Sequence, residues 1–279
     1  MAYSTLISTD EVAQYIDDQN WVICDCRHDL TDLDAGRNAY NKEHLLGARF
    51  LHLDEDLSGI KTGQNGRHPL PDPEKLIAKL GSLGIDNETQ VVAYDAQGGI
   101  FASRLWWLMR WLGHDAVVVM DGGINQWISE GKQVTSVLPQ IVPKNFERRP
   151  GELPVNATFV LTHVDKQGML LVDARAPDRF AGQNETLDPV GGHIPGAMNR
   201  FFKLNLDEQG RFKSPQVLKQ EFATLLGERN PNEIVHQCGS GVTACHNLLA
   251  MEHAGLTGSR LYPGSWSEWC ADRGRPIET

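Results

Sequence analysis

The sequence contains the same series of motifs twice, in the same order. The first half has WVICDCR, EHLLGARF, QVVAYDA and MDGGINQW, and the second half has MLLVDAR, GHIPGAMNRF, EIVHQCG and YPGSWSEW. Matched residues lie 142 to 149 positions apart in four pairs: Asp25 and Asp173, His44 and His193, Asp95 and Cys238, and Trp127 and Trp269. Self-similarity over this length indicates a duplicated domain, because each copy is long enough to bury its own core.

We therefore expect two copies of one domain, at residues 1–140 and 155–279, joined by a linker at 141–154. Prolines are frequent in and around the linker, at Pro139, Pro143, Pro150 and Pro154. Proline fixes φ and has no backbone N–H, so this segment should be extended and irregular.

Short apolar runs alternate with helical patterns in both copies. Buried strands are predicted at Trp21–Cys24, Val91–Tyr94, Val117–Met120, Leu170–Val172 and Ile234–Gln237, with a weaker strand at Arg260–Tyr262. Apolar residues at helical spacing predict helices over Ile100–Leu112 and Thr243–Ala254. This alternation is typical of α/β domains, in which helices cover both faces of a parallel sheet.

The composition limits the classes of partner and the location. A net charge of −10 argues against nucleic-acid binding, because neutralising phosphates requires a basic surface. We expect neither a secretory signal nor a membrane span, because the start has no basic region before an apolar one and no apolar run reaches about 18 residues. Five cysteines at irregular spacing suit a reducing compartment. We expect a cytoplasmic monomer, since two internal domains can bury their own apolar faces.

One cysteine occupies the position at which α/β domains usually place chemistry. Cys238 directly follows the strand predicted at Ile234–Gln237, and Gly239, Ser240 and Gly241 separate it from the next helix. Two glycines allow backbone N–H groups to turn inward, and the helix N-terminus adds partial positive charge. Many cysteines at strand ends are small buried hydrophobes, but this loop would stabilise a thiolate and favours a nucleophile.

The first copy differs at the corresponding turn, which reads Tyr94-Asp95-Ala96-Gln97-Gly98-Gly99. Asp95 lies where Cys238 would fall, so this turn has no thiol nucleophile. We expect the first domain to have kept the fold and lost the chemistry, and the second domain to hold the active site.

These segments resemble a known family. CGSGVTAC resembles the active-site loop of mercaptopyruvate sulfurtransferases, and HIPGA (193–197) and YPGSWSEW (262–269) are similar to two signature segments of rhodanese-like proteins. EHLLGA and DGGINQW are weaker copies in the first half. The resemblance covers nearly the whole chain and implies two tandem rhodanese-like domains, the first inactive and the second catalytic.

The resemblance also implies a reaction. The Cys238 thiolate would take a sulfur atom from thiosulfate or 3-mercaptopyruvate and pass it from a persulfide to cyanide, a small thiol or a protein thiol. No cofactor and no metal are expected. Thiosulfate-preferring relatives tend to have Arg-Lys after the cysteine, whereas this chain has Gly239 and Ser240, as in the mercaptopyruvate type.

In the mercaptopyruvate type, the serine is thought to act with a histidine and an aspartate from the first domain. The segments GRHPLP and LHLDEDLSG match these to His68 and Asp54, and such a relay could handle protons. His68 precedes Pro69, so a solvated surface histidine is the alternative interpretation.

Donor binding in the family uses arginine. Arg179 in APDRF matches the arginine that pairs with the donor carboxylate, and Arg175 in VDAR is expected to form a structural ion pair near Asp173. The loop residues Gly239, Gly241, Val242 and Thr243 would contribute to the same site. The family's second carboxylate-binding arginine would fall at Thr186, so half of the expected pair is absent there and thiosulfate stays open as a donor.

Four other interpretations remain to be weighed. A cysteine phosphatase requires an arginine six residues after the nucleophile, where this chain has Ala244. A non-catalytic rhodanese-like module for protein binding or sulfur sensing generally lacks the cysteine, which this chain keeps. Cys24-Asp25-Cys26 lacks a second ligand pair at zinc spacing and is expected to pack in the core. Cys245 could pair with Cys238, although burial is favoured.

Overall fold

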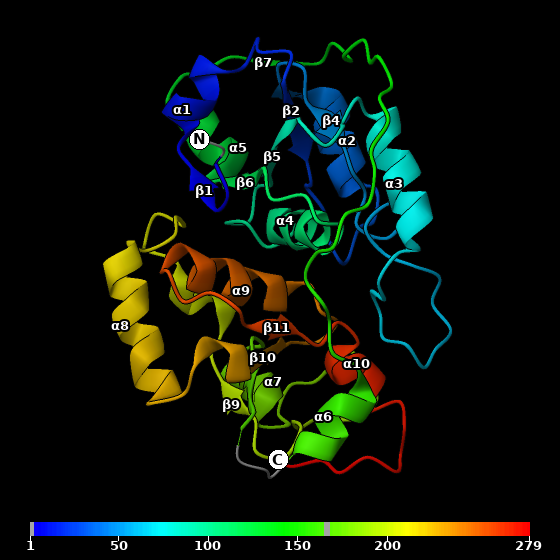
Figure 1. Ribbon diagram of the computed structural model, residues 1–279, viewed down its shortest axis with the longest axis vertical. Helices are drawn as coiled ribbons and strands as arrows, with labels where there is room; N and C mark the ends of the chain where they lie inside the picture. Colours follow the sequence, from blue (N-terminus) through cyan, green and yellow to red (C-terminus); the bar gives the residue numbers. More distant parts are fainter. Residues whose placement is uncertain (1–2, 165–167) are drawn as a thin grey trace. The chain divides into compact units, whose positions relative to one another are not determined.

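The computed structural model describes residues 3–164 and 168–279, which form two compact units (Figure 1). Unit 1 comprises the residues up to Gly59, Pro71–Glu152 and Glu208–Phe212. Unit 2 comprises Ile60–Leu70, Leu153–Asp207 and Lys213–Thr279.

The elements of unit 1 alternate between strand and helix except at β3 and β4, which follow one another. They are β1 (Leu6–Ile7), α1 (Thr9–Gln14), β2 (Trp21–Asp25), α2 (Ala35–Lys42), β3 (His44–Leu45), β4 (Arg49–Phe50), α3 (Pro73–Ser82), β5 (Gln90–Tyr94), α4 (Ala102–Trp111), β6 (Val117–Met120), α5 (Gly123–Ser129) and β7 (Val134–Thr135). The main sheet has the order β1-β6-β5-β2-β4, and its neighbouring strands are parallel. β3 and β7 form a small antiparallel pair.

Apolar side chains explain why these segments of unit 1 fold as they do. β5 and β6 are buried along their whole length, as expected of central strands in a parallel sheet. α4 packs against both of them and buries Trp106, Trp107 and Trp111. These tryptophans therefore belong to the core of unit 1.

Unit 2 repeats this architecture in shorter form. Its elements are α6 (Ala157–His163), β8 (Leu170–Asp173), α7 (Pro177–Phe180), β9 (Met198–Asn199), a 3₁₀ turn at Phe202–Asn205, α8 (Pro215–Leu226), a 3₁₀ turn at Pro231–Glu233, β10 (Ile234–Gln237), α9 (Thr243–His253), β11 (Arg260–Leu261) and α10 (Ser265–Trp269). The sheet order is β11-β10-β8-β9 with parallel neighbours. β10 in unit 2 and β5 in unit 1 are both interior strands, as the repeat predicts.

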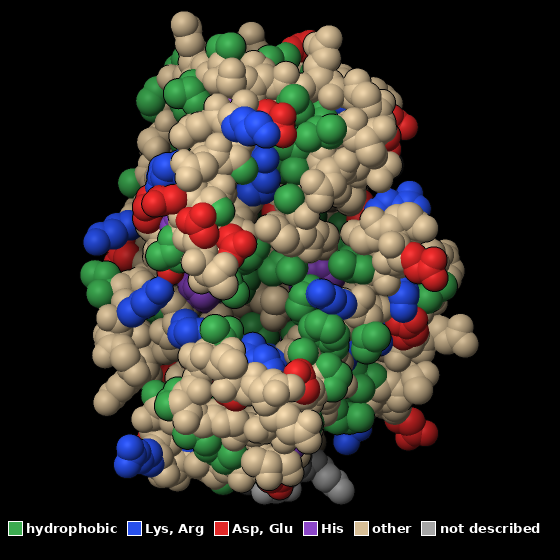
Figure 2. Space-filling view, turned by 180° about the vertical axis from the view of Figure 1, so that it is seen from behind, with side chains coloured by type: hydrophobic (Ala, Val, Ile, Leu, Met, Phe, Trp, Pro, Cys, Tyr) green, Lys and Arg blue, Asp and Glu red, His purple; other side chains and the backbone are tan. Residues whose placement is uncertain are grey.

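The α/β prediction is confirmed in both units, since helices flank each parallel sheet (Figure 1). Within the described residues, no helix is long and apolar enough to cross a membrane. On the face drawn in Figure 2, Lys and Arg side chains are interspersed with Asp and Glu.

Residues 60–70 contact unit 2 although their neighbours in sequence belong to unit 1. The Arg67 backbone N–H donates to Ser267 Oγ at 3.0 Å, and Gly66 has a φ of +85°. A Cβ on Gly66 would lie 2.8 Å from the Gly264 carbonyl oxygen, so only glycine allows this close approach. The segment is thereby anchored beside α10, and we call it the 60–70 segment.

Candidate active site

Cys238 lies at the carboxyl end of the interior strand β10, where parallel sheets place their sites. Its side chain is buried, with the residue 2% exposed. The Gly241 N–H donates to Cys238 Sγ at 3.1 Å, and the Cys238 N–H donates to Ser265 Oγ at 3.1 Å. A backbone donor therefore points at the sulfur, where it can contact a negative charge carried there.

The loop after Cys238 is fastened to α10 by backbone hydrogen bonds. The Trp266 N–H donates to the Cys238 carbonyl at 3.0 Å, and the Ser267 N–H donates to the Gly239 carbonyl at 2.9 Å. Gly241 has a φ of +79°, and a Cβ there would lie 2.3 Å from the Pro263 carbonyl oxygen. Glycine is therefore required at the residue whose N–H contacts the sulfur.

α9 begins directly after this loop. Val242 is the buried N-cap residue, and Thr243 is the first helical residue. The N-terminus of this eleven-residue helix adds positive potential near the loop. The Cys245 thiol donates to the Gly241 carbonyl at 3.3 Å, and all five cysteines are free thiols.

Ser240 contacts one of the residues that the sequence grouped with it. Ser240 Oγ lies 2.7 Å from His68 Nδ1, and both residues are buried. His68 belongs to the 60–70 segment of unit 2, so it is not the solvated surface histidine of the alternative interpretation. A hydroxyl bonded to an imidazole can transfer a proton within the site.

Arg179 and the residues around it form a charged cluster that sequence spacing only partly predicts. Arg179 Nη2 lies 2.8 Å from both Glu185 carboxylate oxygens and 3.5 Å from Asp188 Oδ2. Arg67 Nη1 pairs with Asp188 Oδ1. Of this cluster, sequence reasoning identified only Arg179, and the one signal for Arg67 was its position directly before His68.

The two carboxylates of the cluster respond differently to their surroundings. Burial raises the pKa of Asp188, and this outweighs the lowering effect of Arg67. Burial alone would also raise the pKa of Glu185, but hydrogen bonds from Arg179 and the Leu187 N–H lower it instead. Glu185 is therefore the more firmly ionised of the two carboxylates.

Arg175 forms the structural ion pair that the sequence predicted. Its Nη2 lies 2.7 Å from Asp173 Oδ2 and 2.7 Å from the Gly192 carbonyl. Its guanidinium also lies over the Trp266 ring, 4.8 Å from the centroid. These contacts hold β8 against α10.

Asp54 lies in unit 1, in the turn after β4. Its backbone N–H donates to His52 Nδ1 at 3.1 Å, and its carboxylate lies 3.5 Å from His28 Nε2. The geometry of this group suggests a metal site, because His28, His52 and Asp54 present ligand atoms within 4.8 Å of one another. However, His52 Nε2 lies 2.9 Å from the Leu33 carbonyl while Nδ1 accepts N–H groups, so neither nitrogen is available for a metal.

Unit 1 has a carboxylate where unit 2 has its thiol. Asp95 is buried at the carboxyl end of β5, and its oxygens accept N–H groups of Gln97, Gly99, Phe101 and Ala102 at 2.8 to 3.0 Å. Burial raises the pKa of Asp95, and these hydrogen bonds oppose that effect. The loop that follows this interior strand in each unit is thus suited to bind an anion. In unit 1, the Asp95 carboxylate occupies the position of that anion.

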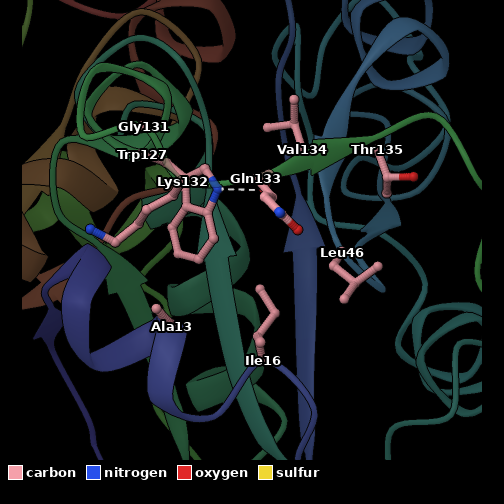
Figure 3. A pocket seen from close by; sticks show the side chains of 9 residues that line it. All are labelled: Ala13, Ile16, Leu46, Trp127, Gly131, Lys132, Gln133, Val134 and Thr135. Carbon is pink, nitrogen blue, oxygen red and sulfur yellow. Dashed lines mark hydrogen bonds between the residues drawn. The ribbon is translucent and has the colours of Figure 1, made fainter.

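A pocket of about 460 Å³ in unit 1 is lined by no cysteine, serine or histidine among the described residues (Figure 3). Ala13, Ile16, Leu46, Trp127 and Val134 give it apolar walls, and the Trp127 Nε1–H donates to the Gln133 carbonyl at 2.9 Å. Cys24 and Cys26 are buried elsewhere in unit 1, as predicted for core residues, and burial raises the pKa of Cys24 to about 12.

The chain is similar to known proteins along nearly its whole length. The family model "Rhodanese-like domain" matches residues 8–130 and again residues 156–272. A Pseudomonas aeruginosa protein named "Probable 3-mercaptopyruvate sulfurtransferase" is 43% identical over 282 residues, which cover 100% of this chain and 99% of that protein.

Two further proteins are similar over most of the chain. The thiosulfate sulfurtransferase of Cricetulus griseus is 36% identical over 239 residues, covering 84% of this chain and 79% of that protein. The solved structure of 3-mercaptopyruvate sulfurtransferase from Leishmania major has a TM-score of 0.86 and 30% identity, covering 98% of this chain and 76% of that one.

Proposed function

The chain belongs to the family of rhodanese-like proteins, and we propose that it is a sulfurtransferase in which Cys238 carries the sulfur atom as a persulfide. The observation that carries this proposal is the Gly241 N–H that donates to Cys238 Sγ at 3.1 Å, in a buried loop between β10 and α9. This donor stabilises the attacking thiolate and afterwards the persulfide anion. The names of the two similar sulfurtransferases support the same chemistry.

In the first half-reaction, the Cys238 thiolate attacks the sulfur of 3-mercaptopyruvate. A sulfur–sulfur bond forms, the carbon–sulfur bond breaks, and its electron pair leaves on the enolate of pyruvate. The enolate then takes up one proton to become pyruvate, and the persulfide loses its proton to become an anion. Covalent storage of the sulfur divides the transfer into two separate steps.

In the second half-reaction, an acceptor removes the outer sulfur. Cyanide attacks this sulfur, the sulfur–sulfur bond breaks, and its electron pair restores the Cys238 thiolate as thiocyanate leaves. A small thiol or a protein thiol takes the same place and leaves as a persulfide.

Ser240 and His68 favour mercaptopyruvate over thiosulfate as the donor. The enolate of pyruvate requires a proton, whereas sulfite leaves thiosulfate with its electron pair and requires none. The Ser240 hydroxyl lies 2.7 Å from His68 Nδ1 and follows Cys238 by two residues in the chain, which supports a role in supplying that proton. The family resemblance assigns Asp54 as the third member of this relay. If it has that role, Asp54→Asn should lower kcat with mercaptopyruvate and leave kcat with thiosulfate unchanged.

Arg179 is the proposed binding group for the donor carboxylate. Its guanidinium nitrogens Nη1 and Nη2 lie 3.7 Å from the position of a Cβ on Gly239. A planar guanidinium at this distance can bind a carboxylate next to the cysteine. Thiosulfate is the alternative donor, with the same mechanism and sulfite as the leaving group. A non-catalytic binding module is less favoured, because the thiol and its N–H donor are both in place.

Location and partners are proposed from the composition. All five cysteines are free thiols, as suits a reducing cytoplasm. We propose a monomer that acts on a small sulfur donor and a thiol or cyanide acceptor, without nucleic acid or membrane.

A paired steady-state assay tests the proposal. Wild type and Cys238→Ser are compared with thiosulfate plus cyanide and with 3-mercaptopyruvate plus a thiol. We expect Cys238→Ser to abolish both activities, and wild-type kcat/KM to be higher with mercaptopyruvate. Activity that survives in Cys238→Ser would overturn the mechanism, and a higher kcat/KM with thiosulfate would overturn the choice of donor.

A further inference from the structure

A buried tyrosine in unit 1 satisfies two buried polar groups at once. Tyr94 is the last residue of β5 and pairs in register with Asp25 of the neighbouring strand β2. The Tyr94 hydroxyl donates to Asp25 Oδ2 at 2.6 Å. The same hydroxyl accepts the N–H of Leu45 at 3.4 Å, and all three residues are buried. Tyr94 therefore provides one donor and one acceptor at this point of the sheet.

The repeat places Gln237 where unit 1 has Tyr94. Gln237 is the last residue of β10, and it pairs in register with Asp173 of β8 as Tyr94 pairs with Asp25. In both units an arginine two residues after this aspartate binds its Oδ2 through Nη2, at 2.6 Å in unit 1 and 2.7 Å in unit 2. The carboxylate to which Tyr94 donates therefore has a counterpart of the same geometry beside Gln237.

Gln237 does not make the hydrogen bonds that Tyr94 makes. Its side chain is fully buried, and among the described residues neither Oε1 nor Nε2 of its amide has a hydrogen-bond partner. A glutamine side chain ends about 3 Å short of a tyrosine hydroxyl in the same place, which is the length of one hydrogen bond. An unpaired buried amide is destabilising, so native structures almost always supply a partner for it.

Two further groups of unit 2 lack the partner that Tyr94 provides in unit 1. Ile194 corresponds to Leu45, 149 positions later in the repeat, and is fully buried. In the described part of the chain, the Ile194 N–H donates to no acceptor. Asp173 Oδ2 accepts only from its arginine among the described residues, whereas Asp25 Oδ2 also accepts from Tyr94. The repeat therefore places an unpaired donor and an acceptor with spare capacity next to the unpaired amide.

The chemistry of these groups selects the ligand. A bare cation would face the Ile194 N–H, and an anion would face the Asp173 carboxylate, so neither suits the position. The ligand has to accept one hydrogen bond, donate another and fit among buried residues. We propose that unit 2 binds an ordered water molecule there, at the position that the Tyr94 hydroxyl has in unit 1.

The water accepts the Ile194 N–H, donates to Asp173 Oδ2 and bonds to the near end of the Gln237 amide. These are the about three hydrogen bonds that buried waters typically make. The site is next to the nucleophile, because Gln237 directly precedes Cys238 in the chain. The water site does not depend on the proposed sulfur transfer, because it follows from buried polar groups alone.

The bridged carboxylate also supports the Cys238 loop from the other side. The arginine that binds Asp173 lies over the ring of Trp266, 4.8 Å from the centroid. The Trp266 N–H in turn donates to the Cys238 carbonyl at 3.0 Å. The water therefore joins the ends of β8 and β10 within the network that holds the nucleophile in place.

A crystal structure of the wild type at a resolution that shows ordered waters tests the site directly. We expect a water within hydrogen-bonding distance of Ile194 N, Asp173 Oδ2 and the Gln237 amide. In Gln237→Tyr, the new hydroxyl should displace this water and donate to Asp173 Oδ2. A wild-type electron-density map without a water at this position would overturn the proposal.

A pair of variants that differ by one hydroxyl gives an independent test. Gln237→Tyr and Gln237→Phe both displace the water, but only Gln237→Tyr replaces its hydrogen bonds. The equilibrium constant for unfolding, measured by denaturant unfolding, should therefore be about tenfold to a hundredfold higher for Gln237→Phe than for Gln237→Tyr. Equal constants would show that no unpaired group faces the position and would overturn the proposal.

Tyr94→Phe in unit 1 is the matched control for this pair. It removes a hydroxyl whose donor and acceptor contacts are both in place, so it should raise the unfolding constant over wild type by a similar factor. Circular dichroism establishes that each variant is folded. If the larger rings prevent unit 2 from folding, the wild-type crystal structure decides the question.

Discussion

Replacing Gly241 with alanine tests the geometry that the account assigns to the Cys238 loop. Gly241 has a φ of +79°, where alanine costs about 1–2 kcal/mol relative to the right-handed region. The added Cβ would also lie 2.3 Å from the Pro263 carbonyl oxygen, and relieving such an overlap costs about 1–3 kcal/mol more. We expect Gly241→Ala to lower the free energy of unfolding by about 2–5 kcal/mol.

Gly255→Ala is the matched control. Gly255 follows α9 with a φ of +73°, and no atom lies within 4 Å of the position of its Cβ among the described residues. Its substitution should cost only the backbone strain of about 1–2 kcal/mol. The difference between the two variants therefore isolates the overlap with Pro263.

The free energy of unfolding of each variant is measured by denaturant unfolding followed by tryptophan fluorescence. The rate of persulfide formation is measured by rapid-quench kinetics. Gly241→Ala must move the N–H that donates to Cys238 Sγ, so persulfide formation should slow by at least about tenfold. Gly255→Ala should retain the wild-type rate. If the two variants were equally destabilised and formed the persulfide at equal rates, the proposed role of the Gly241 backbone in the Cys238 loop would be refuted.

Three further predictions follow from the site and its counterpart in unit 1. Ser240→Ala and His68→Gln should each lower kcat with mercaptopyruvate by about a hundredfold and change kcat with thiosulfate by less than about threefold, measured by steady-state kinetics. Asp95→Ala should lower the free energy of unfolding of unit 1 by at least about 3 kcal/mol, measured by denaturant unfolding, because it leaves four N–H groups without an acceptor, and those of Gly99, Phe101 and Ala102 are buried. The pKa of Glu185 is lowered in the folded protein, so its ionised form stabilises the fold at pH values above its ordinary pKa of 4.5. This contribution is lost as the pH falls through the lowered pKa. The difference in the free energy of unfolding between wild type and Glu185→Gln, measured by denaturant unfolding, should therefore shrink as the pH falls below 4.5.

The strands and helices were largely predictable because their signals are local. Val117–Met120 and Ile234–Gln237 have the same bounds in the structure as in the sequence prediction, since short β-branched runs between turn residues suit buried parallel strands. The predicted helix over Ile100–Leu112 is shorter, as Ala102–Trp111, because Asp95 binds the N–H groups of Phe101 and Ala102 at its start.

The Cys238 loop was also predictable, since strand, cysteine, glycines and helix follow one another in the chain. The ion pair between Arg67 and Asp188 was not, because 121 positions separate these residues and no periodicity relates them. The burial of His68 depends in the same way on the 60–70 segment packing beside Ser267, 200 positions after Arg67. Long-range packing of irregular segments leaves no pattern in a single sequence.

The most direct test of the account is the mass of the Cys238 peptide after reaction with a donor. Wild-type protein is incubated with 3-mercaptopyruvate in the absence of an acceptor, digested without reductant and analysed by mass spectrometry, with Cys238→Ser in parallel. The account predicts one added sulfur atom on the peptide that contains Cys238, its loss on addition of cyanide with release of thiocyanate, and no addition in Cys238→Ser. Sulfur found instead on a peptide containing Cys24, Cys26, Cys245 or Cys270, or on none, would contradict the central claim.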